Sequence, residues 1–400
     1  MNREDFPILE LNKNLIYFDN GATTLKPKVV IDSVINYYTM YTANAHRGDY
    51  KNSAIVDNLY EKTRDKVKDF INAQESSEIV FTSGTTESLN LIVQGYFRKY
   101  LKAGDEVLLT ESEHASNILP WFSLAKEIGI VIKYIKLDDN YEVTIDNLID
   151  SISDKTKVIS IAGVTNVVGD IRPIKDISRI AHDRGILLVV DAAQMIAHSK
   201  IDVQDMDIDF LCFSAHKIYG PTGIGVMYGK FDLLEVMDVV KYGGGMNATF
   251  TSDGYVELRE IPIKFEAGTQ NIAGVLGLSS ALDYVSSIGM DNIIKYEHDL
   301  RKYLVNRLSE IDNIEIYNKS NEGTIVAFNV KDIFSQDLAV YLDKYNICVR
   351  AGNHCAKILN NVFNINNTCR ISLSFYNTRA EVDKLIDVLR NVDKIWEEIL

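Results

Sequence analysis

Short apolar runs alternate with helical patterns between about residues 60 and 230. Helical periodicity covers Thr86 to Lys99, with apolar positions on one face, and Ile174 to Asp183. Strands separated by crossover helices predict an α/β domain whose central sheet is mainly parallel and covered on both faces. The runs that predict buried strands are residues 78–81, 106–109, 158–161, 185–190 and 210–213.

The pattern changes after a long amphipathic stretch over residues 276–308, which has a predicted break at 286–289. This stretch is suited to bridging a large domain and a smaller one. We therefore expect a large domain over residues 14–283 and a smaller α+β domain made of residues 1–13 plus 284–400. The elements predicted in the smaller domain are strands at 324–330, 347–349 and 370–373 and helices at 336–344 and 379–399.

Composition narrows the class of protein. The chain has 400 residues, 46% of them apolar, and a net charge of −14, which disfavours non-specific binding to nucleic acid or anionic lipid. We find no apolar run of about 18 residues and no signal pattern at Met1–Asp5, so we expect neither a membrane span nor export. The four cysteines form no C-x-x-C pair, which argues against a disulfide framework or a metal site and favours a cytoplasmic location.

Polar residues follow each predicted strand, where open α/β sheets bind their ligands. After residues 78–81 come Gly84, Thr85 and Thr86 at the start of a helix. Free N–H groups and the helix dipole make this segment a natural phosphate cradle. The alternative is an ordinary helix cap, with Glu87 in the first turn.

Three further predicted strands are each followed by a polar residue that could contact a ligand. His114 follows residues 106–109 and is a candidate to stack on a planar ligand, although a lone histidine is usually a surface residue. Asn166 follows residues 158–161, where a simple turn is the alternative. Asp191 ends the uncharged run 185–190, and a carboxylate there is costly unless a cation or a helix start meets it.

Lys217 leaves the fifth predicted strand and enters a glycine-rich turn. A desolvated lysine loses basicity and becomes a nucleophile, although a lysine reaching solvent is the alternative. Taken together, the strand ends supply an anion site, a stacking ring, a buried acid and an amine, which pyridoxal phosphate requires. A dinucleotide site is not predicted, because no G-x-G-x-x-G follows a strand.

Cys355 lies in "RAGNHCA", a polar, glycine-containing turn that follows the apolar run 345–349. This setting is unusual for a buried cysteine and marks a candidate reactive thiol. Cys212, Cys348 and Cys369 lie in or beside strand-like runs, and we interpret them as structural.

The motifs "TSGTTES", "ESEHASN", "TNVVGD", "VVDAAQ", "SAHKIYGPTGIG", "FEAGTQN", "RAGNHCA" and "CRISLSFYNT" occur in this order. Their order resembles the class V aminotransferase family of pyridoxal-phosphate enzymes and, more narrowly, the Suf-type (group II) cysteine desulfurases. The resemblance covers nearly the whole chain, from Asp19 to Thr378. It implies the fold of type I pyridoxal-phosphate transferases, which is that of aspartate aminotransferase.

The resemblance also implies roles for single residues. Lys217 would be the Schiff-base lysine, Cys355 the sulfur acceptor, and His114 a stacking residue that also relays a proton. The cofactor would further be bound by Thr85, Thr86, Asn166, Asp191, Gln194, Ser214, His216 and, across a dimer interface, Thr269. The substrate would be bound by His46, Arg47, Asn166, Arg350 and Arg370.

The implied activity is conversion of L-cysteine to L-alanine, with transfer of the sulfur to Cys355 as a persulfide. The implied partners are a second copy of the chain, a small sulfur-accepting protein of a Suf-type system and an iron–sulfur scaffold. The chain departs from the family pattern at Asp49-Tyr50, where a histidine is usual near the pocket, and at Asn353, which replaces a histidine before the cysteine.

Three alternatives remain open at this stage. A selenocysteine lyase or a cysteine sulfinate desulfinase would share the lysine site and need Cys355 less. Another enzyme of the same fold, such as an aminotransferase or epimerase, would make Cys355 incidental. A non-catalytic scaffold would not need Lys217, Asp191 and the threonine cradle.

Overall fold

A seven-stranded sheet forms the centre of the protein, in the order β2-β8-β7-β6-β5-β3-β4. The computed structural model describes residues 3–320 and 322–399, so residues 1, 2, 321 and 400 of the predicted small domain lie outside it. β8 runs antiparallel to both of its neighbours, and the remaining pairs are parallel, which confirms the mainly parallel sheet. The strands are β2 (Ile79–Thr82), β3 (Glu106–Thr110), β4 (Val131–Ile135), β5 (Thr156–Ala162), β6 (Leu187–Asp191), β7 (Phe210–Ser214) and β8 (Gly225–Gly229).

Alternate side chains of these strands enter two separate hydrophobic clusters, because successive residues of a strand point to opposite faces. On β6, Leu188 and Val190 belong to one cluster and Val189 to the other. Helices α3 (Lys51–Phe70), α8 (Ile174–His182) and α11 (Ile272–Ile288) supply the first cluster. Helices α4 (Thr85–Ile92) and α6 (Leu119–Ile128) supply the second, so both faces of the sheet are covered.

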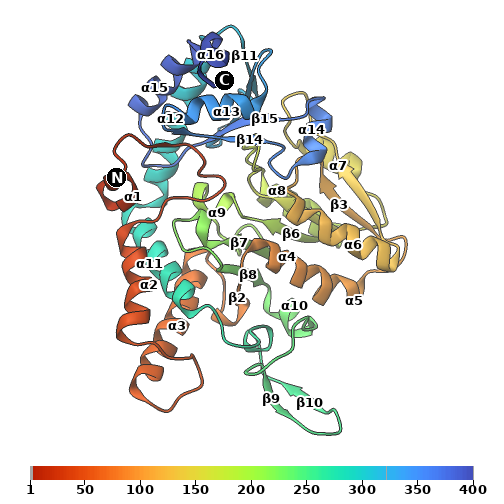
Figure 1. Ribbon diagram of the computed structural model, residues 1–400. Coiled ribbons are helices and arrows are strands. Elements are labelled where there is room, and N and C mark those ends of the chain that lie inside the picture. The colour runs from red at the N-terminus through yellow and green to blue at the C-terminus, as the bar shows by residue number, and fades with distance from the viewer. Residues whose placement is uncertain (1–2, 321, 400) are drawn as a thin grey trace.

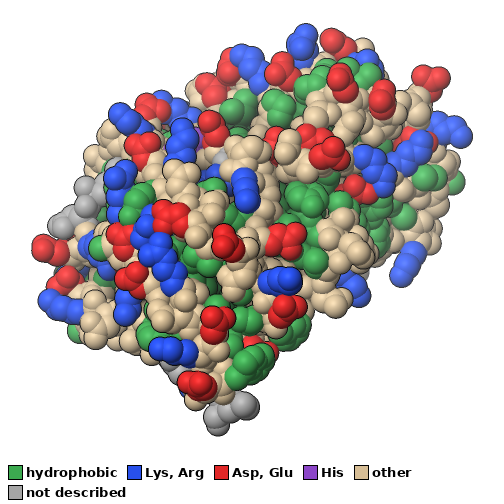
Figure 2. All heavy atoms as spheres, turned by 90° about the horizontal axis from the view of Figure 1, so that it is seen from above, with side chains coloured by type: hydrophobic (Ala, Val, Ile, Leu, Met, Phe, Trp, Pro, Cys, Tyr) green, Lys and Arg blue, Asp and Glu red, His purple; other side chains and the backbone are tan. Residues whose placement is uncertain are grey.

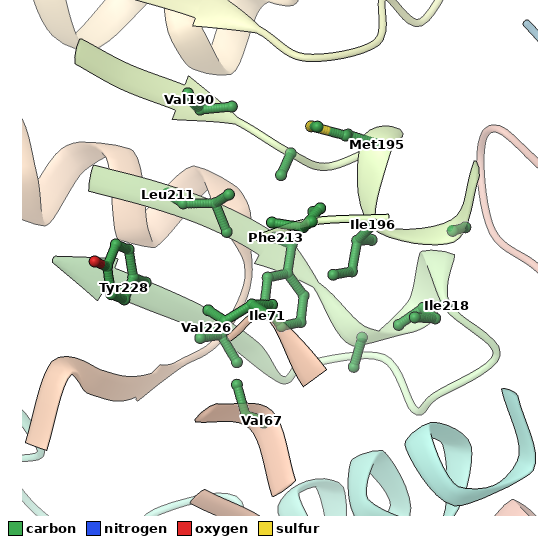
Figure 3. Close-up of a cluster of buried hydrophobic side chains, with 14 of the residues drawn as sticks. Val67, Ile71, Val190, Met195, Ile196, Leu211, Phe213, Ile218, Val226 and Tyr228 are labelled. Carbon is green, nitrogen blue, oxygen red and sulfur yellow. The ribbon is translucent and has the colours of Figure 1, made fainter. Parts of the chain in front are cut away.

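Part of the first cluster is shown in Figure 3, where Leu211, Phe213 and Val226 extend from β7 and β8 toward Val67 and Ile71. All five side chains are fully buried. Burying a large aliphatic or aromatic side chain stabilises a fold by about 1.5 to 3 kcal/mol. This packing fixes the carboxyl end of β7, from which Lys217 follows.

Further helical segments and one hairpin complete the part of the chain around the large sheet. The hairpin of β9 (Asn247–Phe250) and β10 (Val256–Leu258) projects away from the body at the bottom of Figure 1. The remaining helical segments are η1 (Arg3–Asp5), α1 (Pro7–Leu11), α2 (Lys28–Met40), η2 (Ser76–Glu78), η3 (Val93–Phe97), α5 (Arg98–Tyr100), η4 (Ala115–Asn117), α7 (Ile145–Ser151), α9 (Met195–His198), η5 (Ala215–Lys217), α10 (Phe231–Val236) and η6 (Ile263–Phe265).

A second, antiparallel sheet in the order β11-β12-β15-β14 lies at the top of Figure 1. It has its own hydrophobic cluster, to which α12, α13 and α15 contribute. The sheet consists of β11 (Ile314–Tyr317), β12 (Ile325–Val330), β14 (Arg350–Gly352) and β15 (Thr368–Ser372). Its helices are α12 (Met290–Leu308), α13 (Ser335–Asp343), α14 (Lys357–Phe363), α15 (Arg379–Leu389), η7 (Val392–Lys394) and α16 (Ile395–Ile399).

The predicted break at 286–289 is confirmed, because α11 ends at Ile288 and α12 begins at Met290. Gly289 between them has a φ of 87°, a conformation that glycine adopts readily.

Among the described residues, no single helix has both the length and the apolar composition needed to cross a membrane. α11 and α12 satisfy the criterion only as a pair that is bent by 75°. Acidic and basic side chains are interspersed over the face in Figure 2.

Three predicted elements differ in detail from the observed ones. The helix predicted from Thr86 to Lys99 contains a π-helical segment, η3, where the carbonyl of Gly95 accepts a hydrogen bond from the N–H of Asp238. The strand predicted at 347–349 is divided: β13 (Ile347–Cys348) pairs with β1 (Ile16–Tyr17), and β14 pairs with β15. The terminal helix ends at Leu389 and resumes after η7.

Candidate active site

A cavity of about 240 Å³ lies at the carboxyl ends of β5, β6 and β7 and is bordered by the turn after β14. Most of the predicted site residues line it, although they come from positions far apart in the sequence. Those residues are Thr85, Thr86, His114, Asn166, Asp191, Gln194, Ser214, His216, Lys217, Arg350, Cys355 and Arg370.

The predicted phosphate cradle begins α4 and is held by β7. Ser214 at the end of β7 accepts a hydrogen bond from the N–H of Thr85 at 2.8 Å, and the two hydroxyl oxygens are also 2.8 Å apart. The cradle lies tightly against β8, because a Cβ atom on Gly225 would be 2.4 Å from the Cα of Gly84. The sequence therefore places the start of a helix, with its unpaired N–H groups, at the cavity wall.

Asp191 ends β6 and is buried, with an exposed fraction of 4%. Burial raises the pKa of this carboxyl to about 6, and a hydrogen bond from the N–H of Ala193 to Oδ1 at 2.9 Å opposes that shift. A cationic partner in the cavity would favour the ionised form. This environment suits a carboxylate that faces the protonated ring nitrogen of a cofactor such as pyridoxal phosphate.

Asp191→Asn is expected to stabilise the cofactor-free protein, because it removes a buried carboxylate. The folded-state pKa of about 6 lies above the unfolded value of about 3.9, so the cost of ionisation grows as the pH rises between them and reaches roughly 3 kcal/mol. Urea unfolding should show that the advantage of the variant is larger by roughly 1 to 2 kcal/mol at about pH 7.5 than at about pH 5. An equal advantage at both pH values would contradict the shifted pKa.

Lys217 ends the short turn η5, which follows β7 directly. Desolvation lowers the pKa of this amine to about 8, while the nearby Asp191 carboxylate opposes the shift. The side chain keeps some exposed area, as expected for a group that lines a cavity. A larger share of neutral amine at neutral pH makes Lys217 a better nucleophile than an exposed lysine.

His114 lies beside the cradle. Its Nδ1 accepts a hydrogen bond from the backbone N–H of Ser116 at 3.1 Å, whereas its Nε2 makes no hydrogen bond to the residues that the structure describes. Desolvation, followed by the positive charges of Lys217 and Arg370, lowers the pKa of the imidazole to about 4. His114 is therefore neutral at physiological pH.

Arg370, from β15, brings a buried guanidinium to the cavity. Its Nη2 donates to Oδ1 of Asp19 and its Nη1 donates to the carbonyl of Asn166, both at 2.9 Å. Nε of Arg370 and Oδ1 of Asn166 are buried without a partner in the described residues. Arg350 is half-exposed at the same edge, with Nη1 at 3.8 Å from Asp19. Two guanidinium groups thus face one wall of the cavity, which suits a carboxylate ligand.

Cys355 is exposed, whereas Cys212 and Cys369 are buried and Cys348 is half-buried. Burial raises the pKa of Cys212 and Cys369, so these thiols are poor nucleophiles. His354 and Cys355 both have a positive φ, of 50° and 57°. Three contacts fix this turn: the Cys355 N–H donates to Oδ1 of Asn353, the Ala115 N–H donates to the Cys355 carbonyl, and Asn166 donates to the His354 carbonyl.

The structure does not bring Thr269, His46 and Arg47 into this cavity. Thr269 lines a separate hollow, and its Oγ1 accepts a hydrogen bond from Asn44 at 3.3 Å. His46 and Arg47 line a third hollow of about 250 Å³, where His46 contacts Glu61 and Arg47 donates to the carbonyl of Gly244. Their predicted roles at the site would require a second copy of the chain, and they stay predictions.

Sequence reasoning missed several residues that support the site. Asp19 holds Arg370 although it is distant from it in the sequence. Glu113, next to His114, forms a fully buried ion pair with Arg172 and also accepts hydrogen bonds from Asn117 and the N–H of Ala162. The sequence signal for this ion pair was the position of Glu113 between a buried strand and His114. A carboxylate buried there requires a positively charged partner.

The arrangement fits pyridoxal phosphate. The helix start at Thr85 and Thr86 suits the phosphate, Lys217 the aldehyde and Asp191 the ring nitrogen. Buried polar atoms without a partner in the described residues, Nδ1 of His216 and Oδ1 of Asn166, are consistent with a bound polar group. Gln194 already donates to the carbonyl of Gly21 at 2.8 Å, so its predicted role in binding the cofactor stays a prediction.

Comparison with known proteins identifies the class. The model of the aminotransferase class-V family matches residues 16–385, and the chain belongs to this family. A probable cysteine desulfurase of Halalkalibacterium halodurans is 42% identical over 397 residues, which are 98% of each chain. A cysteine desulfurase of Yersinia pestis is 39% identical over 396 residues, again 98% of each chain.

Solved structures agree on the fold. The apo structure of a cysteine desulfurase from Thermococcus onnurineus NA1 has a TM-score of 0.93 and 38% identity, and the match covers 98% of this chain and 97% of that one. The cysteine desulfurase CsdA of Escherichia coli, in an S-sulfonic acid form, has a TM-score of 0.92 and 33% identity over 100% of this chain and 98% of that one. The predicted fold of pyridoxal-phosphate-dependent transferases is confirmed.

Proposed function

We propose that this protein is a pyridoxal-phosphate-dependent cysteine desulfurase that converts L-cysteine to L-alanine and receives the sulfur on Cys355. One observation carries the proposal: the exposed cysteine lines the same cavity as Lys217, Asp191 and the Thr85–Thr86 cradle. The similarity to cysteine desulfurases over almost the full length of the chain supports the same activity.

Several cavity residues have proposed roles that their surroundings support. Bound pyridoxal phosphate supplies an electron sink for bonds at the α-carbon of an amino acid. Lys217, whose pKa is lowered to about 8, would bind the cofactor aldehyde and could carry the α-proton of the substrate. Arg370 and Asn166 would bind the substrate carboxylate, and Arg350 would add a second positive charge at the cavity edge.

The sulfur step requires a nucleophile on the protein. The Cys355 thiolate attacks the substrate sulfur, so that an S–S bond forms while the bond from that sulfur to the substrate β-carbon breaks. The electron pair of the broken bond remains with carbon, which takes up a proton, and alanine leaves. The result is one persulfide on Cys355 for each alanine. The positive φ of Cys355 and the contacts of its turn hold the residue at the cavity edge.

We further propose that the enzyme is a cytoplasmic homodimer of the Suf type. A dimer would account for the positions of Thr269, His46 and Arg47 outside the cavity of their own chain. Exposed apolar side chains, among them Met40 at 70% and Phe250 at 71%, supply surface for a second copy. The persulfide sulfur would pass to the thiol of a small acceptor protein and then support iron–sulfur cluster assembly.

The activity test uses purified protein loaded with pyridoxal phosphate. L-Cysteine with a thiol reductant is expected to give alanine and sulfide in equal amounts. Selenocysteine and cysteine sulfinate, offered under the same conditions, distinguish the lyase and desulfinase alternatives. Turnover of either compound without turnover of L-cysteine would overturn the proposal.

A further inference from the structure

The hydrogen bonds of His114 determine which of its nitrogens carries the proton. The backbone N–H of Ser116 donates to Nδ1 at 3.1 Å, and a backbone N–H cannot accept. Nδ1 must therefore be the bare nitrogen. Because the imidazole is neutral, its hydrogen lies on Nε2, since both side-chain hydrogen bonds that His114 makes to described residues are at Nδ1. His114 thus offers a donor, not a base, to a ligand in the cavity.

A chain of two hydroxyl groups continues from Nδ1 to the phosphate cradle. Oγ of Ser116 is 3.1 Å from Nδ1 of His114 and 2.7 Å from Oγ1 of Thr86. Since Nδ1 carries no hydrogen, its contact with Oγ is a hydrogen bond only if Ser116 donates. The Ser116 oxygen then accepts from Thr86, so the Thr86 hydroxyl hydrogen is directed toward Ser116.

We propose that the Ser116 hydroxyl is a positioning group that connects the phosphate cradle to His114, so that an occupied cradle changes the hydrogen bonding of Nδ1. The Thr86 hydroxyl has one hydrogen and cannot donate to Ser116 and to a phosphate together. When a phosphate takes that hydrogen, the Thr86 oxygen becomes an acceptor, and Ser116 donates to it instead of to His114. Nδ1 then retains only the backbone N–H of Ser116.

This inference rests on the proposed cofactor site, in which Thr86 binds the phosphate. Other charged groups also act on His114: Lys217, Arg370 and Arg350 lower its pKa, and Glu113 raises it. These groups and the phosphate charge are the same in a Ser116→Ala variant. The variant also keeps the backbone N–H that fixes the Nε2–H form. A comparison with wild type therefore isolates the hydroxyl chain.

The experiment measures the pKa of His114 by deuterium exchange at its ring Cε1 position, followed by mass spectrometry over a range of pH. Wild type and Ser116→Ala are compared, each free of cofactor and saturated with pyridoxal phosphate. Ser123→Ala, an exposed serine on the following helix, is the matched control. Histidine peptides distant from the cavity, such as that of His182, serve as internal standards.

In the cofactor-free protein, the pKa of His114 should be higher in Ser116→Ala than in wild type by about half a unit to one unit, because a donor to the bare nitrogen is lost. Saturation with pyridoxal phosphate should reduce this difference, and Ser123→Ala should match wild type throughout. Equal pKa values in the cofactor-free proteins, or a difference that saturation leaves unchanged, would overturn the inference. If the protein failed to bind the cofactor, the proposed function would fail, while the cofactor-free comparison would still test the link from Ser116 to His114.

Discussion

Lys217→Ala should abolish both the visible absorbance of the lysine-bound cofactor and the turnover of L-cysteine. The substitution removes the partly desolvated amine at the cavity, whose pKa is lowered to about 8. Loss of a group that acts both as nucleophile and as proton carrier should lower kcat by about three orders of magnitude or more. Absorbance spectra and alanine formation measure the two effects.

Lys200→Ala is the matched control, because this lysine forms an exposed ion pair with Asp291 on the surface. It should retain wild-type absorbance and turnover, since exposed ion pairs contribute little to stability. Urea unfolding of both variants checks that the fold is intact. Full absorbance in Lys217→Ala would mean that another amine holds the cofactor.

Cys355→Ala should retain the cofactor absorbance but lose sulfide release from L-cysteine by at least about a hundredfold. The variant keeps Lys217 and the cradle, so the cofactor site is unchanged. It lacks the one exposed thiol of the described residues. The measurement is sulfide and alanine formation in the presence of a reductant.

Cys348→Ala provides the control for this prediction. Cys348 is half-buried in β13, which pairs with β1, and it does not line the cavity. Its replacement should leave sulfide release within about twofold of wild type, as for a small change away from the reacting atoms. Undiminished sulfide release by Cys355→Ala would show that the cysteine is incidental, as in the aminotransferase or epimerase alternative.

The strands that the sequence predicts are those with uninterrupted apolar runs. β5, β6 and β7 lie in the middle of the sheet and are buried on both faces, so their composition is unambiguous. β8 was missed because its sequence, Gly225–Gly229, begins and ends with glycine, which usually indicates a turn. Glycine is required at position 225, because the backbone of Gly84 lies too close for a side chain there. β4 was missed because it is a half-exposed edge strand.

The candidate site was predictable to the extent that parallel strands end at one edge of the sheet. This rule predicts that the cradle, His114, Asp191 and Lys217 lie close together. It could not place Arg370, which lies on β15 of the other sheet, or Cys355, which lies in the turn after β14, and the family resemblance was needed for them. Nor could it give the Nε2–H form of His114, which depends on a backbone N–H two residues away.

Cys355 is the residue that we propose receives the substrate sulfur. To test this, the cofactor-loaded protein is treated with one equivalent of L-cysteine without reductant, and the masses of its cysteine-containing peptides are then measured. The Cys355 peptide should become heavier by one sulfur atom, and alanine should form in equal amount. The added sulfur should be absent in Lys217→Ala. Alanine formation with an unmodified Cys355 peptide, or with the added sulfur on Cys348, would contradict the proposal.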